Sequence, residues 1–441
     1  MKLDDALHEV AAFSVGDRLE GLKQHLNPDW IEEALALAGT VTLRRRRLPA
    51  EQVVWMVIGM GLMRNLPIEQ VVDKLELALP DRKNTLIAKS AISKARRRVG
   101  EDPLAYLFTA TAAEWATRSA AADRWRGLAL YGLDGTVMRV ADSPENRAAF
   151  GGHTNGAGRG ESGYPLVRVV AMMALRSHLL SGFRFADFHT GETTLARDIW
   201  NEVPEESLVI VDRGFLVKKD LIHLETSGNR HWLSRTKVNT KWAIRERLGK
   251  DDYLAEWDVQ QTGLPTTWTV RVVHYKKKGL PRATLLTSLL DPEKYPAKEL
   301  IALYHERWET EIGYDEIKTH LLNREEAIRS KTPAGVRQEL WGIALAYNLV
   351  RLEMERVAAE AGVPPTRISF VGSLAMIRDE FHTLSLRSMT PGAMPASLAR
   401  LRQRLKRLIL PPRRPERAYP RAVKVKMSNY PRKRPSVRRP K

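Results

Sequence analysis

The stretch from Tyr304 to Lys318, which reads YHERWETEIGYDEIK, holds residue types that could do chemistry at a helical spacing. Tyr304, Arg307, Glu311 and Lys318 follow one another at steps of three, four and seven residues. At about 100° per residue these steps return to nearly the same azimuth, so a helix would present all four side chains on one face. A buried structural face would be apolar, whereas this face carries one carboxylate among two cations and a phenol. It suits metal-dependent chemistry on the phosphates of a nucleic acid.

Two aspartates in apolar surroundings are candidates for the same site. Asp134 lies in LDGT and Asp212 ends the apolar run of IVDRG. An acid in a buried run is costly unless it binds metal or is hydrogen-bonded. Phosphodiester cleavage and strand transfer use two divalent ions, and magnesium prefers oxygen ligands. Either aspartate alone is better explained as a strand-end acid or a turn former; together with Glu311 they predict a catalytic site of three metal-binding carboxylates.

Other acids of the same helix compete with Glu311 for the third ligand position: Glu306, Glu309, Asp315 and Glu316. Only Glu311 lies almost in line with Arg307 and Lys318, and Asp315 is its nearest rival. The eleven histidines form no HExxH pair, so a zinc enzyme is not expected.

The first hundred residues predict short helices. The expected segments are Leu19–His25, Pro28–Leu37, Pro49–Arg64, Ile68–Leu79 and Ser90–Val99. One basic cluster lies at Arg44 to Arg47, and another, with Arg96 and Arg97, lies near the end of the last helix. Such a unit is compatible with helix-turn-helix DNA binding, although arginines late in a helix also complement its dipole. An Ala-rich connecting helix is expected over 103–125.

The pattern then changes to an α/β sheet of mixed strand direction. The expected strands are Leu128–Val140, Pro165–Leu179, Gly182–Thr190, Ser207–Phe215 and Arg230–Lys237, with helices at Thr193–Glu202 and Val217–Thr226. The glycine-rich segment Ser143–Gly163 has no phosphate-binding motif and is expected to be a flexible surface loop.

A small β-rich insertion is predicted over 238–290, followed by helices. Its strands are expected at Tyr253–Val259, Thr266–Tyr275 and Arg282–Ser288. The helix with the four spaced residues is expected at about Lys298–Leu322, and further helices at Pro333–Glu360, Ser369–Phe381 and Leu398–Leu408.

Composition indicates a basic protein with real cores. The 441 residues are 43% hydrophobic and carry a formal charge of +19, which points to a polyanionic partner. Residues 411–441 hold 12 Lys or Arg, one acid and seven prolines, the composition of an extended arm that could follow phosphates or of a solubilising tail. The absence of cysteine, a charged start without a signal-peptide core and the shortness of the longest apolar run lead us to expect a soluble cytoplasmic protein that does not enter a membrane.

These residues resemble a known family. DGT at Asp134, DRGF at Asp212 and the pattern Y-x2-R-x3-E-x6-K at Tyr304, Arg307, Glu311 and Lys318 look like the DDE transposases of the insertion sequence four group, often called the YREK group. The likeness covers about residues 130–320, and the first hundred residues resemble the helical DNA-binding region of that group less specifically.

The resemblance implies an RNase H-like catalytic core in which Asp134, Asp212 and Glu311 bind two Mg²⁺ or Mn²⁺ ions. It also implies cut-and-paste transposition through nicking, hairpin formation, hairpin opening and insertion into target DNA. Tyr304, Arg307 and Lys318 would then hold DNA phosphates. The partners would be the transposon ends and the target, both double-stranded DNA bound by a homodimer, in association with the bacterial nucleoid.

Seven segments are expected along the chain. They are a helical DNA-binding domain at 1–102, a connecting helix at 103–127, the first part of the RNase H-like core at 128–237, the β-rich insertion at 238–290, the second part of the core at 291–330, a helical C-terminal region at 331–410 and the basic proline-rich tail at 411–441.

Hairpin chemistry would need a base flipped out against an aromatic side chain. Trp308 beside Arg307 is a candidate, as are Trp242, Trp257 and Trp268 in the insertion, each of which could instead pack in a core. Arg168, a polar residue in an apolar strand, is a candidate phosphate contact. Two alternatives stay open at this point: a metal-dependent nuclease without strand transfer, and a domesticated DNA-binding protein.

Overall fold

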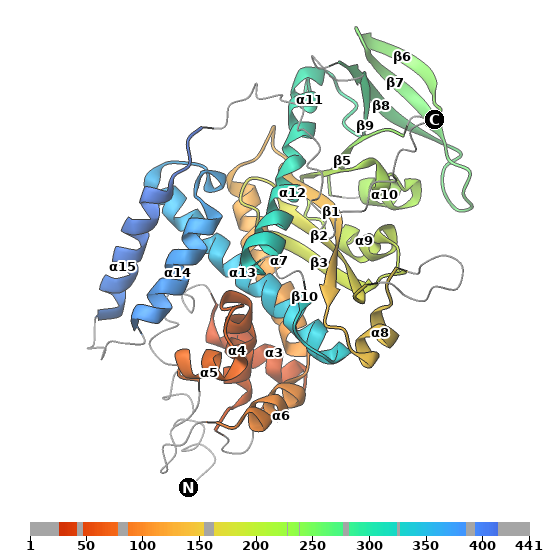
Figure 1. The fold of residues 1–441 in the computed structure, drawn as a ribbon. Helices are drawn as coiled ribbons and strands as arrows, with labels where there is room; N and C mark the ends of the chain where they lie inside the picture. Colours follow the sequence, from red (N-terminus) through yellow and green to blue (C-terminus); the bar gives the residue numbers. More distant parts are fainter. Residues whose placement is uncertain are drawn as a thin grey trace, which may run out of the picture.

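The computed structural model of the chain describes residues 26–41, 47–77, 87–153, 163–226, 228–237, 239–276, 282–323, 327–384 and 393–412 (Figure 1). The expected helix at Leu19–His25, the basic residues Arg44 to Arg46 and nearly all of the basic tail lie outside these ranges.

The described helices reproduce most of the expected ones. They are α3 (Pro28–Leu37), α4 (Ala50–Leu62), α5 (Ile68–Lys74), α6 (Lys89–Val99), α7 (Asp102–Ala122), α8 (Pro144–Phe150), α9 (Glu192–Trp200), α10 (Lys218–Glu225), α11 (Ala297–Glu306), α12 (Trp308–Asp315), α13 (Pro333–Ala361), α14 (Phe370–Leu384) and α15 (Ala393–Leu405). Local signals set their ends: Thr332 caps α13 by accepting from the Gly335 N–H, and Gly362 ends it at φ 63°. The start of the glycine-rich segment, expected to be loop, forms α8 instead, because Ser143 caps it and Pro144 suits a first helical turn.

The described strands form one ten-stranded sheet of mixed direction. They are β1 (Ala129–Val140), β2 (Leu166–Ala174), β3 (Leu180–Asp187), β4 (Ser207–Val211), β5 (Arg230–Arg235), β6 (Ala243–Gly249), β7 (Asp252–Asp258), β8 (Thr267–Tyr275), β9 (Ala283–Thr287) and β10 (Ala327–Ile328). Their order is β3-β2-β1-β4-β5-β9-β8-β7-β6, and β10 pairs with β1. β1, β2 and β3 pair antiparallel, whereas β4 lies parallel to β1 and β5 parallel to β4.

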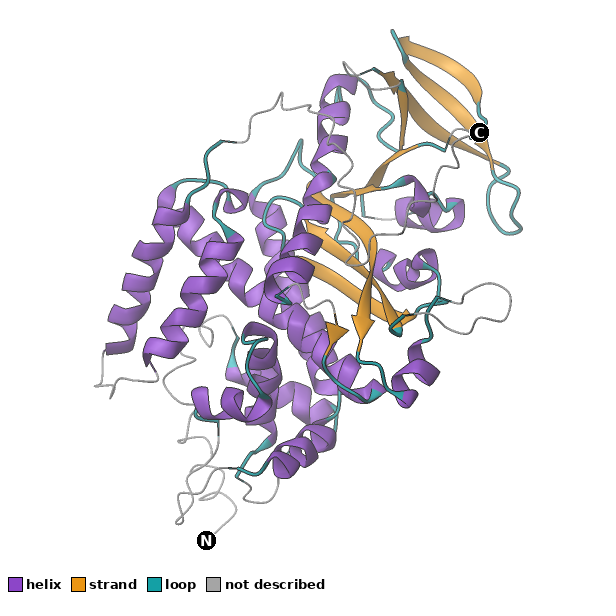
Figure 2. Cartoon of the chain, viewed as in Figure 1, coloured by secondary structure: helices purple, strands orange, loops and turns teal. Residues whose placement is uncertain are grey.

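The β-rich segment continues this sheet, because β9 pairs antiparallel with β5. The three expected strands are confirmed as β7, β8 and β9, while β6 was not predicted. Most of β6 is exposed, so it lacks the apolar alternation by which a half-buried strand is found. The strands β6–β8 extend beyond the helices that surround the rest of the sheet (Figure 2).

Helices cover both faces of the central sheet. Phe183 of β3 contacts Phe108 of α7 and Trp341 of α13, with ring centroids 5.8 and 5.7 Å apart. The neighbouring Gly182 points the opposite way, where a Cβ would lie 3.0 Å from Ile199 of α9. α7 and α13 therefore share one face, and α9 lies on the other.

The N-terminal helices pack directly against α13, far along the chain. Gly61 of α4 faces Gly342 of α13, and a Cβ on Gly342 would lie 2.6 Å from Val57. The two helices approach this closely because each has a glycine where it faces the other.

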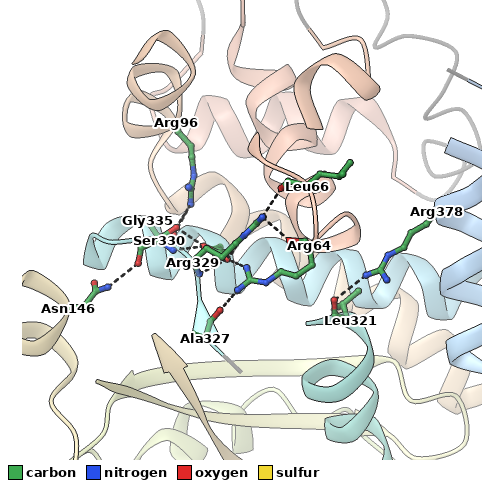
Figure 3. A network of polar contacts seen from close by, with 11 residues as sticks. Arg64, Leu66, Arg96, Asn146, Leu321, Ala327, Arg329, Ser330, Gly335 and Arg378 are labelled. Atoms are coloured by element: carbon green, nitrogen blue, oxygen red, sulfur yellow. Dashed lines mark hydrogen bonds and ion pairs between the residues drawn. The ribbon is translucent and has the colours of Figure 1, made fainter. Parts of the chain in front are cut away.

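A buried polar network strengthens this junction (Figure 3). Glu339 of α13, 1% exposed, pairs with Arg64 and accepts from the Ser330 hydroxyl at 2.6 Å. Arg64 also donates to the Ala327 carbonyl of β10, and Arg329 donates to the Arg64 carbonyl at 2.8 Å. The helices of the first hundred residues are thus bonded to a strand that pairs with β1.

We expect Glu339→Gln to lower the free energy of unfolding by about 3–5 kcal/mol, because it leaves buried arginines without their counter-charge. Chemical denaturation followed by circular dichroism measures this loss. Glu101→Gln is the control, since its partner Arg337 lies 3.7 Å away and is exposed, and its cost should stay below about 1 kcal/mol. Equal losses in the two variants would contradict the structural role of the network.

Candidate active site

Asp134 and Asp212 lie side by side on the neighbouring strands β1 and β4, where the strand order of the sheet reverses. β1 and β4 are parallel neighbours with Leu133 opposite Val211, so the two aspartates are the next residues along each strand. Because Leu133 and Val211 are opposite in register, the two aspartates lie at the same level of the sheet. Their strands are about 4.8 Å apart. Ligands of open α/β sheets bind at such carboxyl ends.

β1 continues past the end of β4 without a strand beside it. β2 pairs with one edge of β1 over Tyr131–Arg139, while on the other edge β4 pairs only up to Leu133 and β10 begins at Arg139. Within the described residues, the stretch from Asp134 to Met138 therefore has an open edge.

α12 brings Glu311 to the same place. A Cβ on Gly132 of β1 would lie 2.3 Å from the Thr310 side chain, so the helix rests directly on the strand. Arg307, at the start of α12, joins the two carboxylates: its guanidinium lies 3.6 Å from Asp134 Oδ2 and 2.7 Å from Glu311 Oε1.

A cleft of about 600 Å³ opens at this contact. Its lining residues are Asp134, Gly135, Thr136, Glu311, Tyr314, Asp315, Lys318 and Thr319. The Lys318 ammonium donates to the Thr136 hydroxyl at 3.2 Å. The cleft thus holds two of the predicted catalytic acids and one predicted phosphate-binding cation.

Burial raises the pKa of the Asp134 carboxyl to about 6, and the negative charges of Asp212 and Glu311 act in the same direction. The Gly135 N–H and the Arg307 guanidinium oppose this shift. The three acids therefore interact electrostatically, although Asp212 is not part of the cleft lining; its carboxylate accepts from the Gly214 N–H at 2.6 Å.

No group of three acid, histidine or cysteine side chains in the described part of the chain is arranged to hold a metal ion. The donor set itself, three carboxylates, is of the kind that a hard divalent cation prefers.

The helix that was expected over Lys298–Leu322 is not continuous. α11 ends at Glu306, Arg307 joins it to α12, and a π-helical turn follows at Glu316–Leu321. The expectation of one unbroken face was wrong in this respect. Arg307, Glu311 and Lys318 still meet at the site. Tyr304 lies outside the cleft lining. Burial raises the pKa of Tyr304, and the charges of Arg307 and Asp212 also affect this pKa.

Buried charges hold the π-helical turn in place. Glu316 is paired with Arg351 of α13 and accepts from the Tyr347 hydroxyl at 2.7 Å. His178, at the turn between β2 and β3, contacts both Glu316 and Glu309, the latter at 2.8 Å. π-helical turns occur often at functional sites, and this one carries Lys318.

Arg96 and Arg168, two expected DNA contacts, bond within the protein. Arg96 donates to Gln338 at 2.6 Å and to the Gly335 carbonyl at 2.8 Å, so in this structure its guanidinium serves the N-terminal junction; the neighbouring Arg97 is exposed. Arg168 pairs with Glu192 at 2.9 Å and donates to the Phe188 carbonyl.

The tryptophans differ in their surroundings. Trp257 and Trp268 are each 8% exposed and stack on one another, and Trp242 is partly buried. Trp308 is 47% exposed, so of these four it has the most surface for a base.

Sequence reasoning missed Tyr314. Its hydroxyl donates to the Asp134 carbonyl at 2.6 Å, and only its position three residues after Glu311 could have drawn attention to it. The Glu316–Arg351 pair was missed as well, because it joins residues 35 apart.

Comparison with known proteins identifies the family of this chain. The family described as "Insertion element 4 transposase N-terminal" matches residues 17–109, and "Transposase DDE domain" matches residues 128–349. "Transposase InsG for insertion sequence element IS4" from Escherichia coli (strain K12) is 36% identical over 440 residues, 98% of each chain. "Putative transposase InsZ" from the same strain is 37% identical over 212 residues, 48% of this chain and 69% of that protein.

The match over residues 128–349 makes the chain a DDE transposase. The chain belongs to the insertion element 4 family of these enzymes. A solved piggyBac transposase synaptic complex with hairpin DNA aligns with 91% of this chain and 87% of its own, with a TM-score of 0.42 and 12% identity, a likeness too distant to support an argument. Within the described residues, none of the helices has the length and apolar character needed to cross a membrane.

We expect Glu316→Gln to lower the free energy of unfolding by about 3 kcal/mol at pH 7. Burial alone would raise the pKa of Glu316, but Arg351 and His178 lower it to about 2, so the carboxylate stabilises the fold above its unfolded pKa and loses this effect as the pH falls towards 2. Denaturant unfolding of both proteins between pH 7 and 3 should show the difference shrinking below about pH 4.

The matched control for that experiment is Glu114→Gln, whose partner Arg118 lies 3.6 Å away on the surface of α7. Its cost should stay below about 1 kcal/mol at every pH. A difference for Glu316→Gln that does not change with pH would show that the pair is not the source of the stabilisation.

Proposed function

We propose that this transposase performs cut-and-paste transposition with Asp134, Asp212 and Glu311 as its catalytic, metal-binding carboxylates. One observation carries the proposal: Arg307 bridges Asp134 and Glu311 beside the end of β4, where Asp212 follows. Asp134 of β1 and Glu311 of α12 line one cleft, and Asp212 follows β4, the strand beside β1. The spacing of Tyr304, Arg307, Glu311 and Lys318 supports membership of the YREK subgroup.

The topology supports an RNase H-like core. The order β3-β2-β1-β4-β5, with an antiparallel β1–β3 meander and β4 and β5 parallel to β1, is the arrangement expected for that core, and β6–β9 would be its β-rich insertion. We propose the same segment boundaries as the sequence predicts. α13, which begins the C-terminal region, packs directly on the core sheet through Trp341.

The acids fit two Mg²⁺ or Mn²⁺ ions by their chemistry. When bound, such ions activate the attacking oxygen and stabilise the leaving oxygen of phosphodiester cleavage. Asp134 would serve as a ligand only as a carboxylate, and its neighbours Asp212 and Glu311 make a local concentration of negative charge that favours a cation. Arg307, which offsets this charge in the structure, would exchange its carboxylate partners for DNA phosphate.

The cations beside the acids suit phosphate binding. Arginine binds phosphate through two parallel N–H donors, and lysine binds it as a point charge. Arg307 and Lys318 would hold the scissile region, with Tyr304 nearby and Trp308 available to stack on an extruded base. Hairpin formation at the ends would place a strand in this cleft.

The DNA partners would be the ends of an insertion sequence and a target duplex, as the names of the relatives suggest. The net charge of +19 fits a polyanion, and Arg97 offers a cation on the N-terminal helices. Pairing of two ends favours a homodimer on DNA, in the bacterial cytoplasm and associated with the nucleoid.

We expect Asp134→Ala, Asp212→Ala and Glu311→Ala each to abolish cleavage while leaving DNA-end binding nearly intact, because each removes a metal ligand and no DNA contact. Labelled ends from the flanks of the coding region, incubated with Mg²⁺ and resolved on denaturing gels, measure nicks and hairpins. Gel-shift titration measures binding.

Asp315→Ala is the control for that series, because Asp315 lines the same cleft four residues after Glu311 but is 61% exposed and bonded to Thr319. It should cleave at a normal rate. Normal cleavage by Glu311→Ala, or loss of cleavage by Asp315→Ala, would reassign the third ligand. Transfer of a pre-cleaved end into a plasmid distinguishes a transposase from a nuclease that only cuts, and binding without cleavage in the wild type would favour a domesticated DNA-binding protein.

We further expect Lys318→Ala to slow end processing about tenfold to a hundredfold, the effect of losing a charged contact to phosphate. The hairpin yield at saturating DNA is the measurement. A yield equal to that of the wild type would remove Lys318 from the phosphate site.

A further inference from the structure

Tyr314 connects the helix that carries Glu311 to the strand that carries Asp134. Its hydroxyl donates to the Asp134 carbonyl at 2.6 Å and accepts from the Ala171 N–H at 3.0 Å. Asp134 and Ala171 face each other across β1 and β2, so one side chain from α12 bonds both strands at the level of the aspartate.

Two glycines allow the hydroxyl to reach the backbone. A Cβ on Gly313 would lie 2.2 Å from the Met173 methyl of β2, and one on Gly132 would lie 2.3 Å from Thr310. At each contact a glycine on one element leaves room for a side chain of the other, so α12 lies close to β1 and β2. The Tyr314 side chain, 7% exposed, then reaches from α12 to the backbone of both strands.

We propose that Tyr314 is a positioning residue that fixes the separation of the Asp134 and Glu311 carboxylates before metal and DNA bind. This inference rests on the proposed function of the two acids. Glu311 lies one helical turn before Tyr314, so a bond from Tyr314 to the Asp134 backbone fixes the helix to the strand next to both ligands. Sites that bind metal depend on such support, because ligands held in place lose little freedom on binding.

The hydroxyl is suited to a permanent bond. Tyr314 is 7% exposed, so water has little access to the two bonds that its hydroxyl makes.

A hydroxyl that only satisfied two backbone groups would affect stability alone. A positioning hydroxyl also affects metal affinity, and the experiment must separate these effects. The full-length wild type, Tyr314→Phe, Tyr347→Phe and Asp134→Ala proteins are compared for Mn²⁺ binding by electron paramagnetic resonance without DNA, for thermal unfolding, and for single-turnover cleavage with Mg²⁺.

We expect Tyr314→Phe to weaken Mn²⁺ binding about fivefold to tenfold and to slow cleavage about tenfold, as for the loss of one buried hydrogen bond, with DNA-end affinity unchanged. Tyr347→Phe is the matched control: it removes a fully buried hydroxyl that donates its hydrogen bond to Glu316, at 2.7 Å. It should lose thermal stability and bind Mn²⁺ like the wild type.

Hydrogen exchange tests the bridge independently of the variants' stability. In the wild type, Mn²⁺ should further slow exchange in the peptide that contains Ala171, and Tyr314→Phe should remove this effect. Wild-type Mn²⁺ affinity in Tyr314→Phe, equal weakening in Tyr347→Phe, or no Mn²⁺ effect on the Ala171 peptide would overturn the positioning role while the proposed function stands. Mn²⁺ binding by the wild type no stronger than that of Asp134→Ala would instead overturn the proposed metal site, and the inference with it.

Discussion

The contact between α12 and β1 is the constraint on which the candidate site depends. Gly132 and Gly313 let the helix rest on the strands, and a Cβ at either position would lie within 2.3 Å of a neighbouring side chain. Glu311 can approach Asp134 only because of this short distance. Each glycine in a regular element costs about 0.5–1 kcal/mol of stability. These two allow α12 to lie close enough to β1 for Glu311 to approach Asp134.

That short distance creates an electrostatic problem. Asp212 and Glu311 lie close enough to Asp134 for their negative charges to raise its pKa, in addition to the larger effect of burial. Arg307 offsets this repulsion by lying between Asp134 and Glu311. The same guanidinium is of the type that binds phosphate well, so the group that offsets this repulsion in the DNA-free protein is also the one that we propose to bind the substrate.

α13 links this site to the N-terminal helices. Near its start Glu339 pairs with Arg64, which follows α4, and twelve residues later Arg351 pairs with Glu316 of the π-helical turn. These positions are about 18 Å apart along the helix axis. Both carboxylates are buried, so each pair depends on good geometry, and displacement of α13 would disturb both. The helices expected to contact DNA are in this way attached to the element that supports Lys318.

The sequence by itself determined most of the regular elements and indicated the candidate catalytic residues. Apolar periodicity and caps act over a few residues, which is why α3, β1, β8 and α13 were predicted to within about two residues, and why the acids could be recognised by their motifs. Tertiary structure decided what depends on distant partners. Arg96, expected on DNA, bonds to Gln338 instead, Glu316 forms an ion pair with Arg351, and the Tyr314 hydroxyl bridges two strands. No local pattern encodes these contacts, because each joins side chains or backbone groups far apart in the chain that meet only when α12 and α13 pack against the rest of the fold.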